Sequence, residues 1–148
     1  MGELFTLNSA RGILPTVRSL MEKAKQAHTE MELALEQIRE FAARVQMAGG
    51  MELRPDLAGR WNGEAARARA KMNYALGMLR ALGVEVKDLN PGLVDFPTLY
   101  RGREVMLCWQ YGEPDIAWWH GAEEGFRGRK PIDADFELNH GPGGHPAP

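Results

Sequence analysis

An apolar stripe runs without a break through residues 13–45, and this repeat constrains the fold more than any other feature of the sequence. If Ile13 takes heptad position d, every a and d position up to Val45 is apolar. The d residues are Ile13, Leu20, Ala27, Ala34 and Phe41, and the a residues are Val17, Ala24, Met31, Ile38 and Val45. Position e widens the stripe with Leu14, Met21, Leu35 and Ala42, and only His28 interrupts it. The repeat predicts one long helix over about 7–47 that buries this stripe. Thr6 is predicted to cap its start, because its hydroxyl can accept a hydrogen bond from a free amide.

A second apolar stripe follows a stretch rich in glycine and proline at residues 47–59. It predicts a helix from Trp61 to Leu82, which Gly83 ends by taking the left-handed conformation. Alanines recur on both stripes and allow close approach, so we expect an antiparallel helical hairpin over about 7–82. At 1.5 Å per residue, about 25 Å of the longer stripe lacks cover within the hairpin. A sheet or a second copy must cover it, and we expect a homodimer through the helices.

After Gly83 the apolar period changes to two, which is typical of strands. Strands are predicted at 84–89, 93–97, 103–111 and 115–120, the last two forming a hairpin with Gly112 and Glu113 at its tip. The predicted register pairs Trp109 with Ile116, Leu107 with Trp118, and Val105 with His120. Met106, Cys108 and Trp119 then share the opposite face.

Together these patterns predict an α+β fold, with a long antiparallel helical hairpin packed with a small antiparallel β-sheet. We expect one domain over residues 1–132, with the hairpin at about 7–82 and a β-rich part at 83–132. Residues 133–148 contain few core-forming side chains and end rich in glycine and proline. This tail is predicted to be mobile.

Composition excludes several classes of partner. A net charge of −2 gives no general attraction to nucleic acid, and no apolar run reaches the length that spans a membrane. A single cysteine cannot form an intrachain disulfide, which favours a reducing cytoplasm. We therefore expect a cytoplasmic protein that binds neither nucleic acid nor membrane.

His120 is the first candidate for chemistry, because it ends a predicted strand and Glu123 and Glu124 follow closely. A neutral imidazole there can act as a general base or as a metal ligand. The other three histidines lie far away in the sequence, so a structural role for His120 is favoured and no metal site is assigned. Cys108 lies within an alternating apolar strand, which favours a buried, inert thiol over a nucleophile.

The loop GFRGRK at residues 125–130 is the second candidate. Its glycines would let backbone amides approach an anion, and its basic side chains could hold one. Arg101 and Arg103 precede the predicted hairpin and would lie near Arg127 and Arg129 if the hairpin folds back. The alternative without a ligand is an ordinary turn with solvated arginines, since the glycine spacing of known phosphate-binding loops is absent.

The motifs GLVDF, REV, LCW, GEP, WWH and GFRGR occur in this order between residues 92 and 129. Together with the N-terminal FTLNSARGILPTVR, they resemble an uncharacterised bacterial family known as domain of unknown function 2203. The resemblance implies a compact α+β domain ending near Ile132, but no established activity. It also implies which residues are distinctive of the family, and these are Asp95, Arg103, Trp109, Glu113, Trp119, His120, Gly125, Gly128 and Arg129.

The leading functional hypothesis is a non-catalytic protein that binds a small anionic ligand, or an acidic segment of a partner, at the hairpin end. The candidate ligand-binding residues are Arg103, Trp119, His120, Arg129, Asp95 and Glu113. The hypothesis requires Arg103, Arg129 and His120 to point to one side of the sheet. The alternative is a small enzyme that uses His120 as general base or metal ligand, and a further alternative is a helical assembly module. No cofactor motif is present, so the cofactor is left open.

Overall fold

The computed structural model describes residues 4–49 and 55–142, which divide into two compact units. The first unit combines the N-terminal residues up to Met21 with the residues from Leu76 onward, and the second runs from Glu22 to Ala75. Both long helices therefore contribute turns to each unit. The expectation that residues 1–132 form a single domain stays a prediction.

Helix α1 spans Leu7–Met47, close to the predicted range. Its start is fixed by a reciprocal pair of side-chain hydrogen bonds. The amide of Ser9 donates to Oγ1 of Thr6 at 3.0 Å, and the amide of Thr6 donates to Oγ of Ser9 at 2.9 Å. The predicted Thr6 cap is confirmed, and Ser9 takes the place that glutamate or glutamine fills in a capping box.

Helix α2 spans Pro55–Ala81 and begins six residues earlier than predicted. Proline is favoured in the first turn of a helix, because its missing amide would have no partner there. Gly83 has a positive φ of 93° and ends the helix as predicted. None of the helices in the described part of the chain is long and apolar enough to cross a membrane.

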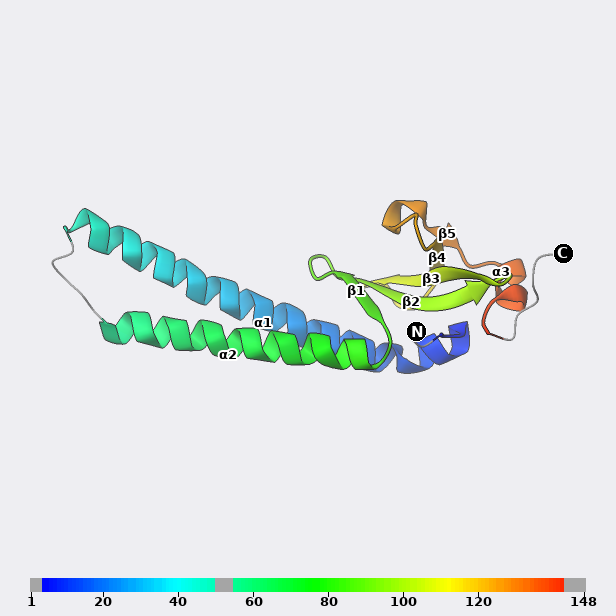
Figure 1. Cartoon of the computed structure of the whole chain (residues 1–148), viewed down its shortest axis with the longest axis horizontal. Coiled ribbons are helices and arrows are strands. Elements are labelled where there is room, and N and C mark those ends of the chain that lie inside the picture. The colour runs from blue at the N-terminus through cyan, green and yellow to red at the C-terminus, as the bar shows by residue number, and fades with distance from the viewer. Residues whose placement is uncertain (1–3, 50–54, 143–148) are drawn as a thin grey trace. The chain divides into compact units, whose positions relative to one another are not determined.

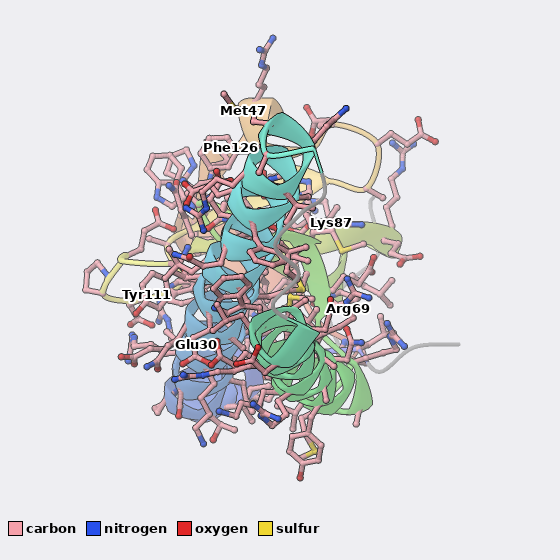
Figure 2. All side chains as sticks on the ribbon, turned by 90° about the vertical axis from the view of Figure 1, so that its left-hand side faces the viewer. Glu30, Met47, Arg69, Lys87, Tyr111 and Phe126 are labelled. Carbon is pink, nitrogen blue, oxygen red and sulfur yellow. The ribbon has the colours of Figure 1, made fainter. Side chains whose placement is uncertain are left out.

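In the second unit α1 and α2 pack as two antiparallel helices (Figure 1). Small side chains make the buried seam, as the heptad pattern predicted, and they are Ala24, Ala27, Ala34, Ala65, Ala68 and Ala75. The rings of Phe41 and Trp61 meet edge to face with centroids 5.6 Å apart. Glu30 lies beside α2 (Figure 2), where its carboxylate is 3.8 Å from Nζ of Lys71. The alanines let the two backbones approach closely.

The first unit contains a five-stranded antiparallel sheet in the order β1-β2-β3-β4-β5. The strands are β1 (Glu85–Asp88), β2 (Leu93–Tyr100), β3 (Arg103–Gln110), β4 (Trp118–Gly121) and β5 (Lys130–Pro131). A short 3₁₀ helix η1 (Phe126–Gly128) lies between β4 and β5. The β2 strand is longer than predicted, and the extended segment before α1 lies along it, since the amide of Phe5 donates to the carbonyl of Pro97 at 2.7 Å.

One face of the sheet forms the main hydrophobic core with the first turns of α1 and the last turns of α2. From α1 this core takes Leu14, Val17 and Met21, and from α2 it takes Leu79. The part of the α1 stripe that exceeds the hairpin is therefore covered by the sheet of the same chain. A second copy is not required for that cover, and the homodimer stays a prediction.

The register of the β3–β4 hairpin differs from the predicted one by a single residue. The structure pairs Leu107 with Trp119, Cys108 with Trp118, and Met106 with His120. The connection is a seven-residue segment at 111–117, in which the buried Ile116 leaves the ladder and enters the core. Because side chains alternate along a strand, this slip moves His120 to the face of Cys108 and moves Trp119 to the core face.

The segment after Ile132 also differs from the expected mobile tail. Helix α3 (Ala134–Asn139) is capped by Asp133, whose side chain accepts a hydrogen bond from the amide of Phe136. Phe136 is fully buried, and its ring packs against the rings of both Tyr100 and Trp119. Nε2 of His140 accepts a hydrogen bond from the amide of Leu7 at 2.8 Å, which satisfies a free donor at the start of α1. Residues 133–142 are thus part of the fold, and 143–148 lie outside the described residues.

Candidate functional site

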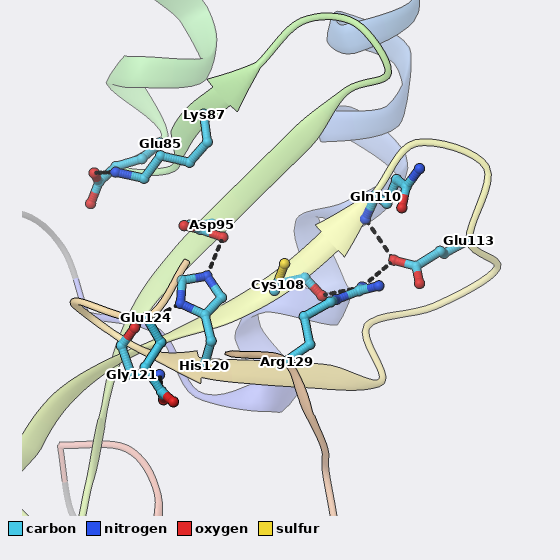
Figure 3. Close-up of polar contacts among 10 residues, drawn as sticks. All are labelled: Glu85, Lys87, Asp95, Cys108, Gln110, Glu113, His120, Gly121, Glu124 and Arg129. Carbon is cyan, nitrogen blue, oxygen red and sulfur yellow. Dashed lines mark hydrogen bonds and ion pairs between the residues drawn. The ribbon is translucent and has the colours of Figure 1, made fainter. Parts of the chain in front are cut away.

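Three neighbouring strands bring Asp95, Cys108 and His120 together on the sheet face opposite the main core (Figure 3). Asp95 lies on β2 directly opposite Cys108 on β3, and His120 on β4 lies opposite the next residue of the same face, Met106. Their ligand atoms all lie within 4.8 Å of one another. The exposed fractions are 2 % for Asp95, 1 % for Cys108 and 3 % for His120, so the cluster is closed to bulk water.

The hydrogen bonds of His120 place a hydrogen on one of its two ring nitrogens. Nδ1 lies 2.8 Å from the carbonyl oxygen of Gly121, which can only accept, so Nδ1 carries a hydrogen. Nε2 lies 3.1 Å from Oδ1 of Asp95. That contact requires one shared proton, held either by the imidazole or by the carboxyl group. In both arrangements the pair is neutral overall, which reduces the cost of burying it.

Burial also governs the acidities of the other two members. It raises the pKa of the Asp95 carboxyl, while His120, Lys87 and the Cys108 thiol act in the opposite direction. Burial, followed by the nearby Asp95 carboxylate, raises the pKa of Cys108 to about 12. At neutral pH the thiol is therefore protonated and a poor nucleophile, as the sequence predicted for an inert buried cysteine.

Arg129 and Glu113 form a separate pair beside this cluster. Nη2 of Arg129 lies 2.6 Å from Oε1 of Glu113, and the same oxygen accepts a hydrogen bond from the backbone amide of Gln110 at 2.6 Å. The guanidinium stacks between the rings of Trp118 and Phe126, at 5.1 and 4.7 Å from their centroids. Glu113 thus neutralises the charge that Arg129 was expected to offer to an anion.

Lys130 of the GFRGRK loop is paired with a nearby carboxylate. The amide of Gly121 and Nζ of Lys130 both donate to Oε1 of Glu124. A β-carbon on Gly128 would lie 2.5 Å from the β-carbon of Glu124, so Gly128 permits a close approach to a carboxylate side chain rather than to an anionic ligand. These contacts favour the alternative in which the loop is a turn.

Arg103 and Trp119 line a third location, a pocket with a volume of ≈ 680 Å³. This volume lies within the range of roughly 300–1,000 Å³ that is typical of small-ligand sites. Arg103 belongs to the β3 face that carries Val105 and Leu107, so its register places it on the opposite face from His120. The six predicted ligand-binding residues therefore separate into three pairs: Asp95 with His120, Glu113 with Arg129, and Arg103 with Trp119. The single anion site built from Arg103, Arg129 and His120 is not assembled.

These features define a class of small α+β protein in which two long packed helices precede a five-stranded antiparallel sheet with a buried Asp-Cys-His cluster. The chain belongs to the uncharacterized conserved protein family DUF2203, whose sequence model matches residues 3–132. Searches of curated proteins and of solved structures found no significant match. Asp95, Cys108 and His120 all lie within the matched region, whereas α3 lies beyond it.

Proposed function

We propose that the chain binds one divalent transition metal ion of the zinc class through Asp95, Cys108 and His120. The observation that carries this proposal is the convergence of a carboxylate, a thiol and an imidazole in one buried cluster. Nitrogen and sulfur ligands of this kind suit zinc and its neighbours rather than magnesium or calcium. Two ligand atoms of a tetrahedral zinc site lie about 3.4 Å apart, and the Nε2 to Oδ1 distance is 3.1 Å.

The hydrogen bond to Gly121 supports the same reading. A histidine that binds a metal usually donates its other ring N–H to a carbonyl or carboxylate, which orients the ring. Nδ1 of His120 makes this bond, and Nε2 faces Asp95. The ring is thus already turned with Nε2 toward Asp95, one of the other two candidate ligands.

Charge balance favours the exchange of protons for a metal. Without metal, the cluster holds one proton shared by Asp95 and His120 and a second on the Cys108 thiol. A divalent cation that displaces both leaves a neutral site, with two negative ligands and one neutral ligand. The buried charge is then the same before and after binding, so the exchange carries no net charge into the interior.

The other reactions weighed for His120 fit less well. Both ring nitrogens are engaged, one by Asp95 and one by Gly121, so neither faces a substrate as a general base requires. The high pKa of Cys108 disfavours nucleophilic catalysis. We place the protein in the cytoplasm, because Cys108 must stay reduced to bind metal.

Metal content tests the proposal directly. Protein produced with zinc in the medium should contain about one equivalent by elemental analysis, and binding to stripped protein should release about two protons per ion. Cobalt in place of zinc should give intense visible bands of a four-coordinate ion and a near-ultraviolet thiolate-to-cobalt band. Less than about a tenth of an equivalent of zinc, together with no thiolate band, would discard the proposal.

We also propose that the helices mediate a homodimer, by a coiled-coil type of contact. Its support is the exposure of large apolar side chains in the second unit, with Leu33 62 % and Tyr74 72 % exposed. Met47 at the end of α1 is exposed as well (Figure 2). Light scattering at micromolar concentration should give twice the chain mass of 16.5 kDa, and Leu33→Glu should shift it toward one chain. A mass of one chain for the unchanged protein would contradict the dimer.

A further inference from the structure

We propose that the pocket beside Arg103 and Trp119, the rim pocket, binds a small planar aromatic molecule that carries one carboxylate. The rim pocket lies where the β2–β3 turn meets the end of β4, and its volume is ≈ 680 Å³. Its lining includes Tyr100, Arg101, Arg103, Val105 and Trp119. The proposal is independent of metal binding, because the rim pocket contains none of the three proposed metal ligands.

A rigid aromatic wall suits a flat ring. Tyr100 and Trp119 are half-buried, with ring centroids 5.0 Å apart, and both line the rim pocket. Behind them, the buried ring of Phe136 stacks on Tyr100 at 5.0 Å and on Trp119 at 4.9 Å. This stack holds both rings in place before a ligand arrives, so little ordering cost remains for binding. Val105 adds apolar surface to the same wall.

The β2–β3 turn supplies the cationic part of the rim. Arg101 and Gly102 have positive φ angles of 52° and 82°, as in a type I′ hairpin turn, where asparagine and glycine are the usual residues. Arg101 is already engaged, because its Nη2 lies 2.7 Å from Asp135 and its guanidinium lies over the Tyr100 ring. Arg103 is exposed, and within residues 4–49 and 55–142 no ion pair includes it. Its guanidinium can hold a carboxylate with two parallel hydrogen bonds.

Acidic side chains also line the rim pocket and restrict the charge of the ligand. Glu104, Glu123 and Glu124 line the rim pocket, and among the described residues only Glu124 of these three forms an ion pair, with Lys130. A ligand with several negative charges, such as a nucleotide, would be repelled by this rim. One carboxylate placed at Arg103, with an uncharged ring against Trp119, avoids that repulsion.

The test compares two probes of nearly equal shape, naphthalene-2-carboxylate and naphthalene-2-carboxamide. Binding is followed by NMR through the indole N–H signals of the four tryptophans, which report each ring separately. The carboxylate should shift the Trp119 signal most and should bind more tightly than the carboxamide. Arg103→Gln should weaken carboxylate binding about tenfold, as expected for a lost charge-assisted pair, and leave the carboxamide unchanged.

Arg127→Gln is the matched control, because Arg127 is exposed and does not line the rim pocket. It removes the same charge and should leave the affinity for both probes unchanged. The proposal is overturned if neither probe binds, if both bind equally, or if the largest shift belongs to another tryptophan. An equal loss in Arg103→Gln and Arg127→Gln would also overturn it, since that result reports only the net charge of the protein.

Discussion

Asp95→Asn, Cys108→Ser and His120→Gln are each expected to lower the zinc affinity of the chain by at least about a hundredfold. Loss of a partner that merely orients a ligand already costs 10- to 100-fold in metal affinity, and each of these changes removes a ligand itself. The substituted side chains keep a similar size, so the buried cluster keeps its packing. Competition with a chromophoric chelator measures the affinity, and the cobalt spectrum reports which ligand has been lost. Cys108→Ser in particular should lose the thiolate-to-cobalt band.

His28→Gln provides the control, because it removes a histidine that lies on α1 within the second unit. It should bind zinc as the unchanged chain does.

Thermal unfolding separates lost binding from lost folding. At a zinc concentration a hundred times Kd, the unchanged chain should gain about 2.7 kcal/mol. That gain corresponds to a rise in Tm of roughly 5–10 °C for a protein of this size. The three variants should melt cooperatively but show no such rise. Zinc affinity within threefold of the unchanged chain in all three would contradict the proposed site.

Local sequence signals predicted the helices well, because each depends on residues close together in the chain. The heptad repeat gave the extent of α1, and Thr6 and Gly83 marked helix ends through hydrogen bonding and backbone conformation that neighbouring residues decide. The resemblance to the family was likewise confirmed over residues 3–132. In the first unit the buried face of α1 is centred nearer to heptad position e, since Leu14 and Met21, predicted at that edge of the stripe, are more deeply buried than Ile13 and Leu20 at position d. A sheet, rather than α2, covers the helix there.

The candidate cluster was out of reach of the same reasoning, because it depends on strand register. The predicted two-residue tip at Gly112 and Glu113 put His120 on the face of Val105, away from Cys108. In the structure the amide of Ile116 is held by the Asp115 carboxylate, and its carbonyl accepts a hydrogen bond from Arg11 of α1. Those contacts take Ile116 out of the ladder and shift the pairing by one residue. Arg11 and Ile116 are 105 positions apart, so their contact cannot be predicted from the pattern of neighbouring residues.

The family resemblance had singled out Asp95 and His120, but nothing in the sequence joined them to Cys108. Asp95 and Cys108 are 13 positions apart and meet only because β2 and β3 form a tight hairpin with full pairing from Leu93 to Tyr100. Cys108 was treated as core, and it is core by burial. Its additional chemistry comes from the two polar neighbours that the sheet places beside it.

The C-terminal segment shows how composition alone can mislead. Residues 133–148 contain two large apolar side chains, Phe136 and Leu138, among many polar and small ones. A single aromatic ring is nevertheless enough to dock α3, because the ring of Phe136 stacks on the rings of both Tyr100 and Trp119. Asp135 adds an ion pair with Arg101, and His140 binds the start of α1.

Phe136→Ala is therefore expected to lower the free energy of unfolding by about 3–5 kcal/mol, the usual cost of removing a fully buried phenylalanine. The ring contacts three other aromatic side chains, so its loss leaves a cavity that these rings cannot close without leaving their own positions. Urea unfolding followed by tryptophan fluorescence measures the change, and Trp119 lies against the cavity.

Leu138→Ala is the control, since Leu138 belongs to the same short helix but is 74 % exposed, and it should change stability by less than about 0.5 kcal/mol. Equal effects of the two substitutions would mean that α3 does not pack against the sheet. In that event the aromatic wall of the rim pocket would lose its support as well, because Phe136 is the residue that holds Tyr100 and Trp119 in place.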